Sequence, residues 1–508
     1  MSPRRARRPS QAPRQRRGAA IALLVLVVLA LGGAVAAELL VEPPGTPAAE
    51  PVAVEPPTSG AWYCPVTGTP EDTAHLTVAA VGGEPSTLSV ERHRGEESTA
   101  ETVTVEPDQP YELALTGGEA AFATTVRWAG GPVVATWRLE GSHLSAAVCE
   151  VAPNPVTHLT GFETTAQSVS QLHLYNPYGV DAVARVVFGT PTGPVTRVLT
   201  DNILVPSRGT TVVALNDYEP EQPDLAVTVE TLTGRLVAQG TVALAPTANQ
   251  PGPTGRDVIT ATGPALDWSF AFARSDEGSS SWLSLYNPGE REAAVEIRVS
   301  NPMPDSPLLL SEVSVPAGGV TRVDVSGASA STEHGVIATS VNELPVVAAR
   351  LTAIRTSAGS EDVAASTGAV ATTSWATVAP MAEHRSRLAV YNPGAEAVTV
   401  SVDVGADTPP EWAALSLGPN EQTTLELEDL DTTVSSLPVV VGSESPVAVD
   451  LRVQAPGAEL RYLTMGAVAA HAWEGPGIRP AVRRDARLST RPAEVSTEDP
   501  ASSASGGQ

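Results

Sequence analysis

The sequence predicts an all-β protein: tandem immunoglobulin-like antiparallel β-sandwich modules after one N-terminal transmembrane helix. Three observations lead to this prediction. A Tyr-Asn-Pro tripeptide recurs at residues 175, 286 and 391. The segments around each copy are short, rich in Val and Thr, and alternate apolar with polar residues, which is typical of half-buried strands. Gly- and Pro-containing turns separate these segments, and we expect about six or seven strands per unit.

The N-terminus predicts a membrane anchor. Residues 1–17 carry seven arginines and form a predicted cytoplasmic tail, and residues 18–37 contain no charge. Twenty helical residues span about 30 Å, the thickness of the hydrocarbon layer. The flanking arginines place the N-terminus in the cytoplasm and the bulk outside, as a single-pass protein of the plasma membrane. The alternative is a signal peptide, cleaved near Ala34-Val35-Ala36, and a secreted product.

Two further segments lack the pattern of folded modules. Residues 38–60 are rich in proline and predict a semi-rigid spacer. Residues 476–508 are rich in Pro, Ser, Ala and Arg and predict a disordered tail.

Between these segments the sequence predicts four β-sandwich modules, at residues 61–152, 153–263, 264–370 and 371–475. In the last three, a strand ends in Tyr-Asn-Pro, and the turn VPSRGT, VPAGGV or LGPNEQ follows 30, 29 or 26 residues after the tyrosine. A final hairpin is expected to close each module. Repetition over units of this length indicates tandem domains, whereas solenoid repeats have periods of 20–50 residues.

The Tyr-Asn-Pro tripeptide has a structural interpretation as a repeated turn motif. Proline ends a strand ladder, asparagine can cap its own turn, and the tyrosine can pack inward with its hydroxyl bonded to the backbone. The alternative is a sugar-binding role for the tyrosine and asparagine. The residues concerned are Tyr175, Asn176, Pro177, Tyr286, Asn287, Pro288, Tyr391, Asn392 and Pro393.

The only two cysteines, Cys64 and Cys149, predict a structural disulfide at the two ends of the first module. A pair outside the cytoplasm is expected to be oxidised. Two cysteines also exclude a four-cysteine zinc site and a disulfide-dense scaffold.

Charge and motifs restrict the function. With 57 acidic residues, 31 arginines and no lysine, the net charge of −26 argues against nucleic-acid binding. The chain lacks the GxSxG, HExxH, P-loop and SxxK motifs, and its eight histidines are scattered. An acidic run (Glu426, Glu428, Asp429, Asp431) lacks the spacing of a calcium loop. We therefore predict no catalytic residue, no cofactor and no metal ligand.

The sequence favours a non-enzymatic cell-envelope protein, membrane-anchored or secreted, that presents its modules for binding or structural roles. Its expected partners are the membrane, through residues 18–37, and wall polymers or envelope proteins. The alternative is a glycan-active envelope enzyme, or an accessory subunit of one, that uses dispersed carboxylates. The eight tryptophans are the best candidates for sugar stacking, although Trp268 and Trp375 occupy similar places in successive modules and are better explained as core residues.

A family resemblance rests on the opening WYCP (62–65), on Cys149 in the last strand of the first module, and on the strands that end in Tyr-Asn-Pro. With these features the chain resembles the domain of unknown function 5719 family of exported actinobacterial proteins, over about residues 60–475. The turn LGPNEQ departs from the Val-Pro pattern of the other two. The resemblance implies a cell-envelope or secreted protein and carries over no catalytic residue.

Overall fold

The computed structural model describes residues 59–469, with gaps at 66–67, 95–96, 108, 119–121, 246–253, 275–278, 301–307, 327–328, 330–332, 356–360, 382–383, 431–434, 456–460 and 467. The predicted cytoplasmic tail, the anchor, nearly all of the spacer and the C-terminal tail at 476–508 lie outside the described residues. No helix in the described part of the chain has the length and apolar character needed to cross a bilayer.

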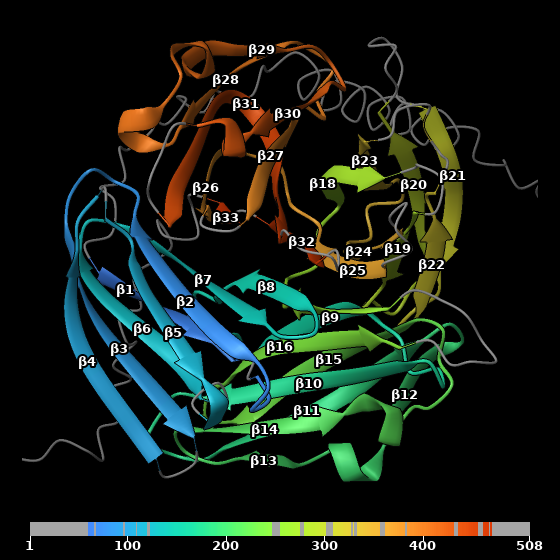
Figure 1. The fold of residues 1–508 in the computed structure, drawn as a ribbon. Coiled ribbons are helices and arrows are strands. Elements are labelled where there is room, and N and C mark those ends of the chain that lie inside the picture. Colours follow the sequence, from blue (N-terminus) through green and yellow to red (C-terminus); the bar gives the residue numbers. More distant parts are fainter. Residues whose placement is uncertain are drawn as a thin grey trace, which may run out of the picture. The chain divides into compact units, whose positions relative to one another are not determined.

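The all-β prediction is confirmed for the described residues, which form antiparallel sheets (Figure 1). Their helical residues form short 3-10 turns, which include Val198–Thr200, Leu215–Asp217, Gly405–Asp407, Pro410–Ala414 and Leu427–Asp429. Each of four successive segments contributes two sheets, and we call these the first to fourth sheet pairs.

The first sheet pair has eight strands. Its sheets are, in spatial order, β1 (Ser59–Cys64), β6 (Ala123–Gly130), β3 (Ser86–Arg94) and β4 (Glu97–Val105), and β5 (Tyr111–Thr116), β2 (Thr73–Ala80), β7 (Val133–Glu140) and β8 (Leu144–Val148). The second sheet pair has nine strands. One sheet holds β12 (Gly193–Thr196), β11 (Ala182–Thr190), β15 (Leu225–Thr233) and β9 (Val156–Phe162), with β13 (Ile203–Val205) also beside β11; the other holds β14 (Gly209–Ala214), β10 (Ser168–Asn176), β16 (Val237–Leu244) and β17 (Gly255–Thr260).

The third sheet pair repeats this plan with eight strands. Its sheets are β18 (Asp267–Arg274), β23 (Glu333–Ser340), β20 (Ala293–Val299) and β21 (Leu308–Val315), and β22 (Val320–Asp324), β19 (Ser280–Tyr286), β24 (Val347–Arg355) and β25 (Glu361–Thr367). In the fourth, one long strand joins both sheets. Its strands are β26 (Thr372–Pro380), β27 (Arg385–Tyr391), β28 (Val398–Asp403), β29 (Leu415–Leu417), β30 (Gln422–Glu426), β31 (Ser436–Ala455), β32 (Arg461–Gly466) and β33 (Val468–Ala469).

The expected closing hairpins are wrong. In the second sheet pair β15 pairs with β9 and β11, whereas β16 pairs with β10 and β17 in the opposite sheet. In the fourth, β31 runs without a break from one sheet into the other. A tight turn between two alternating segments looks the same in sequence whether the second strand folds back or crosses to the other sheet. Only the identity of the pairing partners distinguishes the two.

Each sheet pair encloses a core built mainly from Val, Leu and Ala, as the low aromatic content requires. Three tryptophans anchor the first, third and fourth cores. The indole N–H of Trp62 donates to the carbonyl of Val133 at 3.0 Å, and the Trp268 and Trp375 indoles donate at 2.8 Å to the equivalent carbonyls of Val346 and Val447. Burying the ring while satisfying its single donor makes these side chains core residues.

Neighbouring sheet pairs meet through their last full strands. β8 contacts β17, β17 contacts β25, β25 contacts β32, and β32 contacts β8. A buried carboxylate holds three of these strands together. Asp257 of β17 is fully buried, and its carboxylate accepts backbone N–H groups of Ala146 in β8 (3.3 Å), Val258 (2.8 Å) and Ala365 in β25 (2.6 Å). It thereby satisfies strand-edge donors on both sides.

Candidate functional site

The predicted disulfide is confirmed. Cys64 ends β1 and Cys149 follows β8, with 4.7 Å between the two Cα atoms and 2.10 Å between the sulfurs. Both cysteines are buried in the first core. The bond ties one sheet of the first pair to the other, and its burial identifies it as a structural bond.

The repeated asparagines clamp the turns that follow them. The side-chain amide of Asn176 donates to the carbonyls of Val180 (2.7 Å) and Val205 (3.2 Å), while its Oδ1 accepts the N–H of Tyr178 at 3.0 Å. Asn287 and Asn392 make the corresponding bonds in the third and fourth sheet pairs. Each asparagine therefore joins two turns of its own sheet pair and has no side-chain atom left over for a sugar.

The repeated tyrosines lie at the junctions between sheet pairs. The hydroxyls of Tyr175 and Tyr286 bond to side chains where we expected backbone. The hydroxyl of Tyr175 is 2.8 Å from Oγ1 of Thr125 in the first sheet pair. That of Tyr286 is 2.7 Å from Oγ1 of Thr228 in the second. Burial raises the pKa of each phenol, so both remain neutral hydrogen-bonding groups. Each tyrosine links its own sheet pair to the preceding one.

The other candidate residues are not brought together as a site. No group of three or more His, Cys, Asp or Glu side chains in the described residues could hold a metal ion. In the acidic run, Glu426 pairs with Arg387, and Glu428 lies 4.0 Å from Arg385; Asp431 is outside the described residues. Seven tryptophans are buried, none more than 8% exposed, and Trp473 lies outside the described residues. The seven described rings therefore present no open face to a sugar.

The structure instead places two hollows between the second and third sheet pairs. The first has a volume of about 270 Å³, and its lining includes Glu163 and Gln167 from the second pair and Trp282, Arg322 and Asp324 from the third. The guanidinium of Arg322 lies over the Trp282 ring, 4.1 Å from its centroid. Such a contact fixes the direction of an otherwise flexible side chain.

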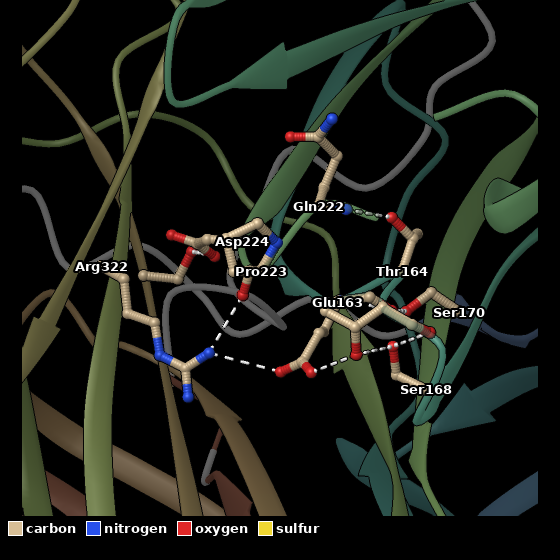
Figure 2. Close-up of polar contacts among 10 residues, drawn as sticks. Glu163, Thr164, Ser168, Ser170, Gln222, Pro223, Asp224 and Arg322 are labelled. Carbon is tan, nitrogen blue, oxygen red and sulfur yellow. Dashed lines mark hydrogen bonds and ion pairs between the residues drawn. The ribbon is translucent and has the colours of Figure 1, made fainter. Parts of the chain in front are cut away.

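Arg322 connects the two sheet pairs by hydrogen bonds as well. Its Nη1 donates to the carboxylate of Glu163 (3.3 Å) and to the carbonyl of Pro223 (3.0 Å), both in the second sheet pair (Figure 2). Glu163 Oε1 also accepts the hydroxyl of Thr165 at 2.7 Å. The Arg322 guanidinium and the Glu163 carboxylate of this hollow are therefore already paired with each other.

A buried acid, Asp224, directly follows Pro223 and lies beside this contact (Figure 2). It is 3% exposed, its Oδ1 accepts the hydroxyl of Ser284 at 2.6 Å, and its Oδ2 makes no hydrogen bond within the described residues. Burial raises the pKa of Asp224 to about 7, although the bond from Ser284 and the charge of Arg322 oppose the shift. The carboxyl is partly protonated at neutral pH.

The second hollow lies at the Tyr-Asn-Pro turn of the third sheet pair and has a volume of about 380 Å³. Its lining includes His158, Thr228 and Glu230 from the second pair and Tyr286, Gly289 and Gly318 from the third. Nδ1 of His158 is 2.8 Å from the Thr228 hydroxyl, which in turn contacts the Tyr286 hydroxyl. Burial lowers the pKa of His158 to about 4, so its ring is neutral at physiological pH.

Sequence reasoning missed the buried acids Asp257 and Asp224. A weak signal for Asp257 was present, because Arg-Asp-Val in β17 is matched by Glu-Asp-Val around Asp362 in β25, at the start of the last strand in successive sheet pairs. Asp224 carries no such pattern. Its burial depends on the third sheet pair, which lies far along the chain.

The fold and its sites define a class: an all-β protein of successive sheet pairs, with hollows between the second and third pairs. The sequence comparison then identifies the family. The family of unknown function DUF5719 matches residues 133–265 and 231–473, and the chain belongs to that family. No curated protein matches the chain.

Proposed function

We propose that this protein is a non-enzymatic cell-envelope protein, anchored in the membrane or secreted, that presents four immunoglobulin-like β-sandwich modules for binding. The proposed modules are residues 61–152, 153–263, 264–370 and 371–475. The Arg-rich tail, the uncharged segment 18–37 and the Pro-rich spacer support the location. Protease added to intact cells should remove the modules, and protection of the residues beyond 60 would contradict an external position.

The observation that carries the binding role is the position of the two hollows. Both lie where the second and third sheet pairs meet, beside side chains fixed by contacts across the junction, such as Arg322 on Glu163 and Tyr286 on Thr228. Binding sites are commonly concave, preformed and placed at domain boundaries. A scaffold locked in this way supports a recognition surface of constant geometry.

Affinity capture from an envelope extract tests this function. The full chain in detergent, immobilised, should enrich a wall polymer or an envelope protein over an unrelated β-sandwich protein of similar acidity. The matched control removes nonspecific electrostatic binding, because a net charge of −26 attracts any cationic material. Equal recovery on both supports would contradict a binding role.

One observation favours the alternative, a glycan-active enzyme. Glu163 and Asp324 both line the first hollow, and glycoside hydrolysis uses two carboxyl groups that flank the scissile bond. However, Glu163 is held by Arg322 and Thr165, and Oδ1 of Asp324 accepts the N–H of Ser326 at 2.8 Å. Turnover of cell-wall glycan by the purified chain, lost in both Glu163→Gln and Asp324→Asn, would establish the enzyme and overturn the non-enzymatic function.

A further inference from the structure

The first two junctions place equivalent residues at equivalent positions, so they can be compared directly. Thr125 and Thr228 each bond the tyrosine of the following sheet pair. In the strand registers, Tyr63 is opposite Thr125, and His158 is opposite Thr228. On the other side of the junction, Tyr178 and Gly289 each directly follow the proline of Tyr-Asn-Pro.

In the first junction, the side chain of Tyr178 fills the space between the turn after Tyr-Asn-Pro and the first sheet pair. The hydroxyl of Tyr178 is 3.3 Å from that of Tyr63, so the phenol ring covers this part of the first sheet pair. Arg208, in the adjoining turn, donates its backbone N–H to the Tyr178 carbonyl. The pKa of His93 is lowered mainly by burial, and the positive charge of Arg208 lowers it further. An aromatic ring and a nearby guanidinium therefore occupy the first junction.

In the second junction the same two positions carry no side chain. Gly289 replaces the tyrosine, and Gly318 replaces Arg208 at a turn position where both have positive φ (62° and 52°). Both glycines line the second hollow. A Cβ at Gly318 would lie 2.7 Å from the ring of Pro194, so Pro194 covers the position of Arg208, whereas a Cβ at Gly289 would meet only Oδ1 of Asn287. The hollow beside Gly289 is therefore the space that the chain's own Tyr178 covers one junction earlier.

The walls of the second hollow suit the same kind of occupant. Val187 replaces Glu91 opposite the threonine, so the floor is more apolar than in the first junction. Val156, which also lines the hollow, is 47% exposed. Glu230 and Glu290 supply two carboxylates, of which Glu230 is paired with Arg185 at 3.3 Å. An apolar floor with acidic groups beside it is complementary to an aromatic side chain that has a cation next to it.

We propose that the second hollow is a docking site for a partner protein, which inserts a tyrosine side chain and places an adjacent basic residue against Glu230 and Glu290. This inference rests on the proposed binding function and specifies the chemistry of its partner. The partner's tyrosine supplies from outside the ring that Tyr178 supplies from within at the first junction, and its basic residue is complementary to the two carboxylates.

The test measures binding of N-acetyl-Tyr-Arg-amide to the purified full chain by calorimetry or by chemical-shift titration. We expect saturable binding with a Kd of about 1 mM or tighter, the range of weak specific contacts. N-acetyl-Tyr-Glu-amide should bind about two- to fivefold more weakly, the effect of an exposed ion pair. Glu290→Gln should reduce this preference.

The decisive variant is Gly289→Tyr, which copies Tyr178 and should fill the hollow from within. A Cβ at Gly289 would lie 3.1 Å from Oδ1 of Asn287, and the equivalent Tyr178 accommodates the same neighbour. We expect at least a tenfold loss of dipeptide binding. The matched control is Gly394→Tyr, at the same position of the fourth sheet pair, which should bind as the unmodified chain does.

The outcomes separate this inference from the broader function. No saturable binding, or equal binding by Gly289→Tyr, would overturn the docking site even if affinity capture succeeds. Dipeptide binding that Gly289→Tyr abolishes would establish the site even if envelope extracts yield no partner, and the envelope function would then fail alone. Equal affinity for the Arg and Glu dipeptides would overturn the assignment of a basic neighbour.

Discussion

Each of the three junctions between successive sheet pairs contains the tyrosine of a Tyr-Asn-Pro motif. The polar contacts around this tyrosine differ between the first two junctions and the third. Tyr175 and Tyr286 each bond a threonine hydroxyl of the preceding sheet pair. At the third junction Ile337 takes the position of the threonine, and the Tyr391 hydroxyl is buried without a hydrogen-bond partner in the described residues. The packing role of the ring is retained while its hydrogen bond is lost.

Charged groups replace that hydrogen bond at the third junction. Arg452 of the fourth sheet pair pairs with Glu333 of the third, and Oδ2 of Asp450 accepts the backbone N–H of Phe272 at 3.1 Å. The guanidinium of Arg452 also lies 4.9 Å from the Phe272 ring centroid. The difference teaches that the tyrosine ring sets where two sheet pairs meet, whereas the surrounding side chains decide which polar contacts hold them. The four predictions below test this comparison in order of expected effect.

The largest effect is expected for Asp257→Ala, which removes a group shared by the first two junctions. Three backbone N–H groups would lose their acceptor, and each buried unsatisfied donor costs about 1–3 kcal/mol. We expect a loss of about 3–5 kcal/mol in the free energy of unfolding, measured with urea. Amide hydrogen exchange should accelerate in β8 and β25.

The control for this change is Asp267→Ala, an exposed acid in β18, which should alter stability by less than about 0.5 kcal/mol. If Asp257→Ala unfolds no more easily than Asp267→Ala, the carboxylate does not hold the strands together.

The disulfide should contribute next, and only to the first sheet pair. Replacing Cys64 and Cys149 by alanine removes a bond across 85 residues of chain and should cost about 2–5 kcal/mol. Amide hydrogens of the first sheet pair should exchange faster. The smallest change in exchange is expected in the part of the fourth core that is remote from β8. Labelling of two thiols in the folded, unreduced chain would show that the bond does not form.

Stability should depend on pH through Asp224 at the second junction. Because its pKa rises to about 7 on folding, the folded chain holds a proton that the unfolded chain releases near pH 4. The stability that this proton contributes is fully present below pH 4. It is lost as the pH rises toward 7, which lowers the free energy of unfolding by about 2–4 kcal/mol. Unfolding measured from pH 4.5 to 8 should show a shallower decline for Asp224→Asn, and identical slopes would contradict the assignment.

Tyrosine-to-phenylalanine changes should have the smallest effects and should separate the junctions most directly. Tyr175→Phe and Tyr286→Phe each lose a buried hydrogen bond and should cost about 1 kcal/mol. Tyr391→Phe removes a hydroxyl without a described partner and should be neutral or stabilising. Thermal unfolding of the three variants, side by side, measures the difference. Three equal losses would mean that Tyr391 has a polar partner after all.

Much of this molecule could be predicted from local patterns. Strand alternation, the recurrence of Tyr-Asn-Pro and the isolated cysteine pair led to an all-β chain, a disulfide between Cys64 and Cys149, and the family. The predicted number of strands per unit, about six or seven, was lower than the eight or nine that the first three sheet pairs contain. Short strands such as β12 and β13 are too brief to show an alternating pattern. The closing hairpins were wrong because alternation does not identify a strand's partner.

The hollows between the second and third sheet pairs could not be predicted in the same way. Gly289 and Gly318 read in the sequence as ordinary turn residues, and their effect appears only when the second sheet pair packs against them. The same holds for Asp224, whose altered pKa comes from burial at a junction. These properties belong to contacts between residues of different sheet pairs.

The sequence by itself determined what each segment becomes: where strands form, that each repeated asparagine caps its own turn, and which two sulfurs join. Such properties depend on neighbouring residues, or on a pair of groups with no other partner. Only the tertiary structure decided that the repeated tyrosines face the preceding sheet pair, that Asp257 is shared by three strands, and that one junction is filled while the next is hollow. These outcomes depend on burial and on partners far along the chain, which no local pattern encodes.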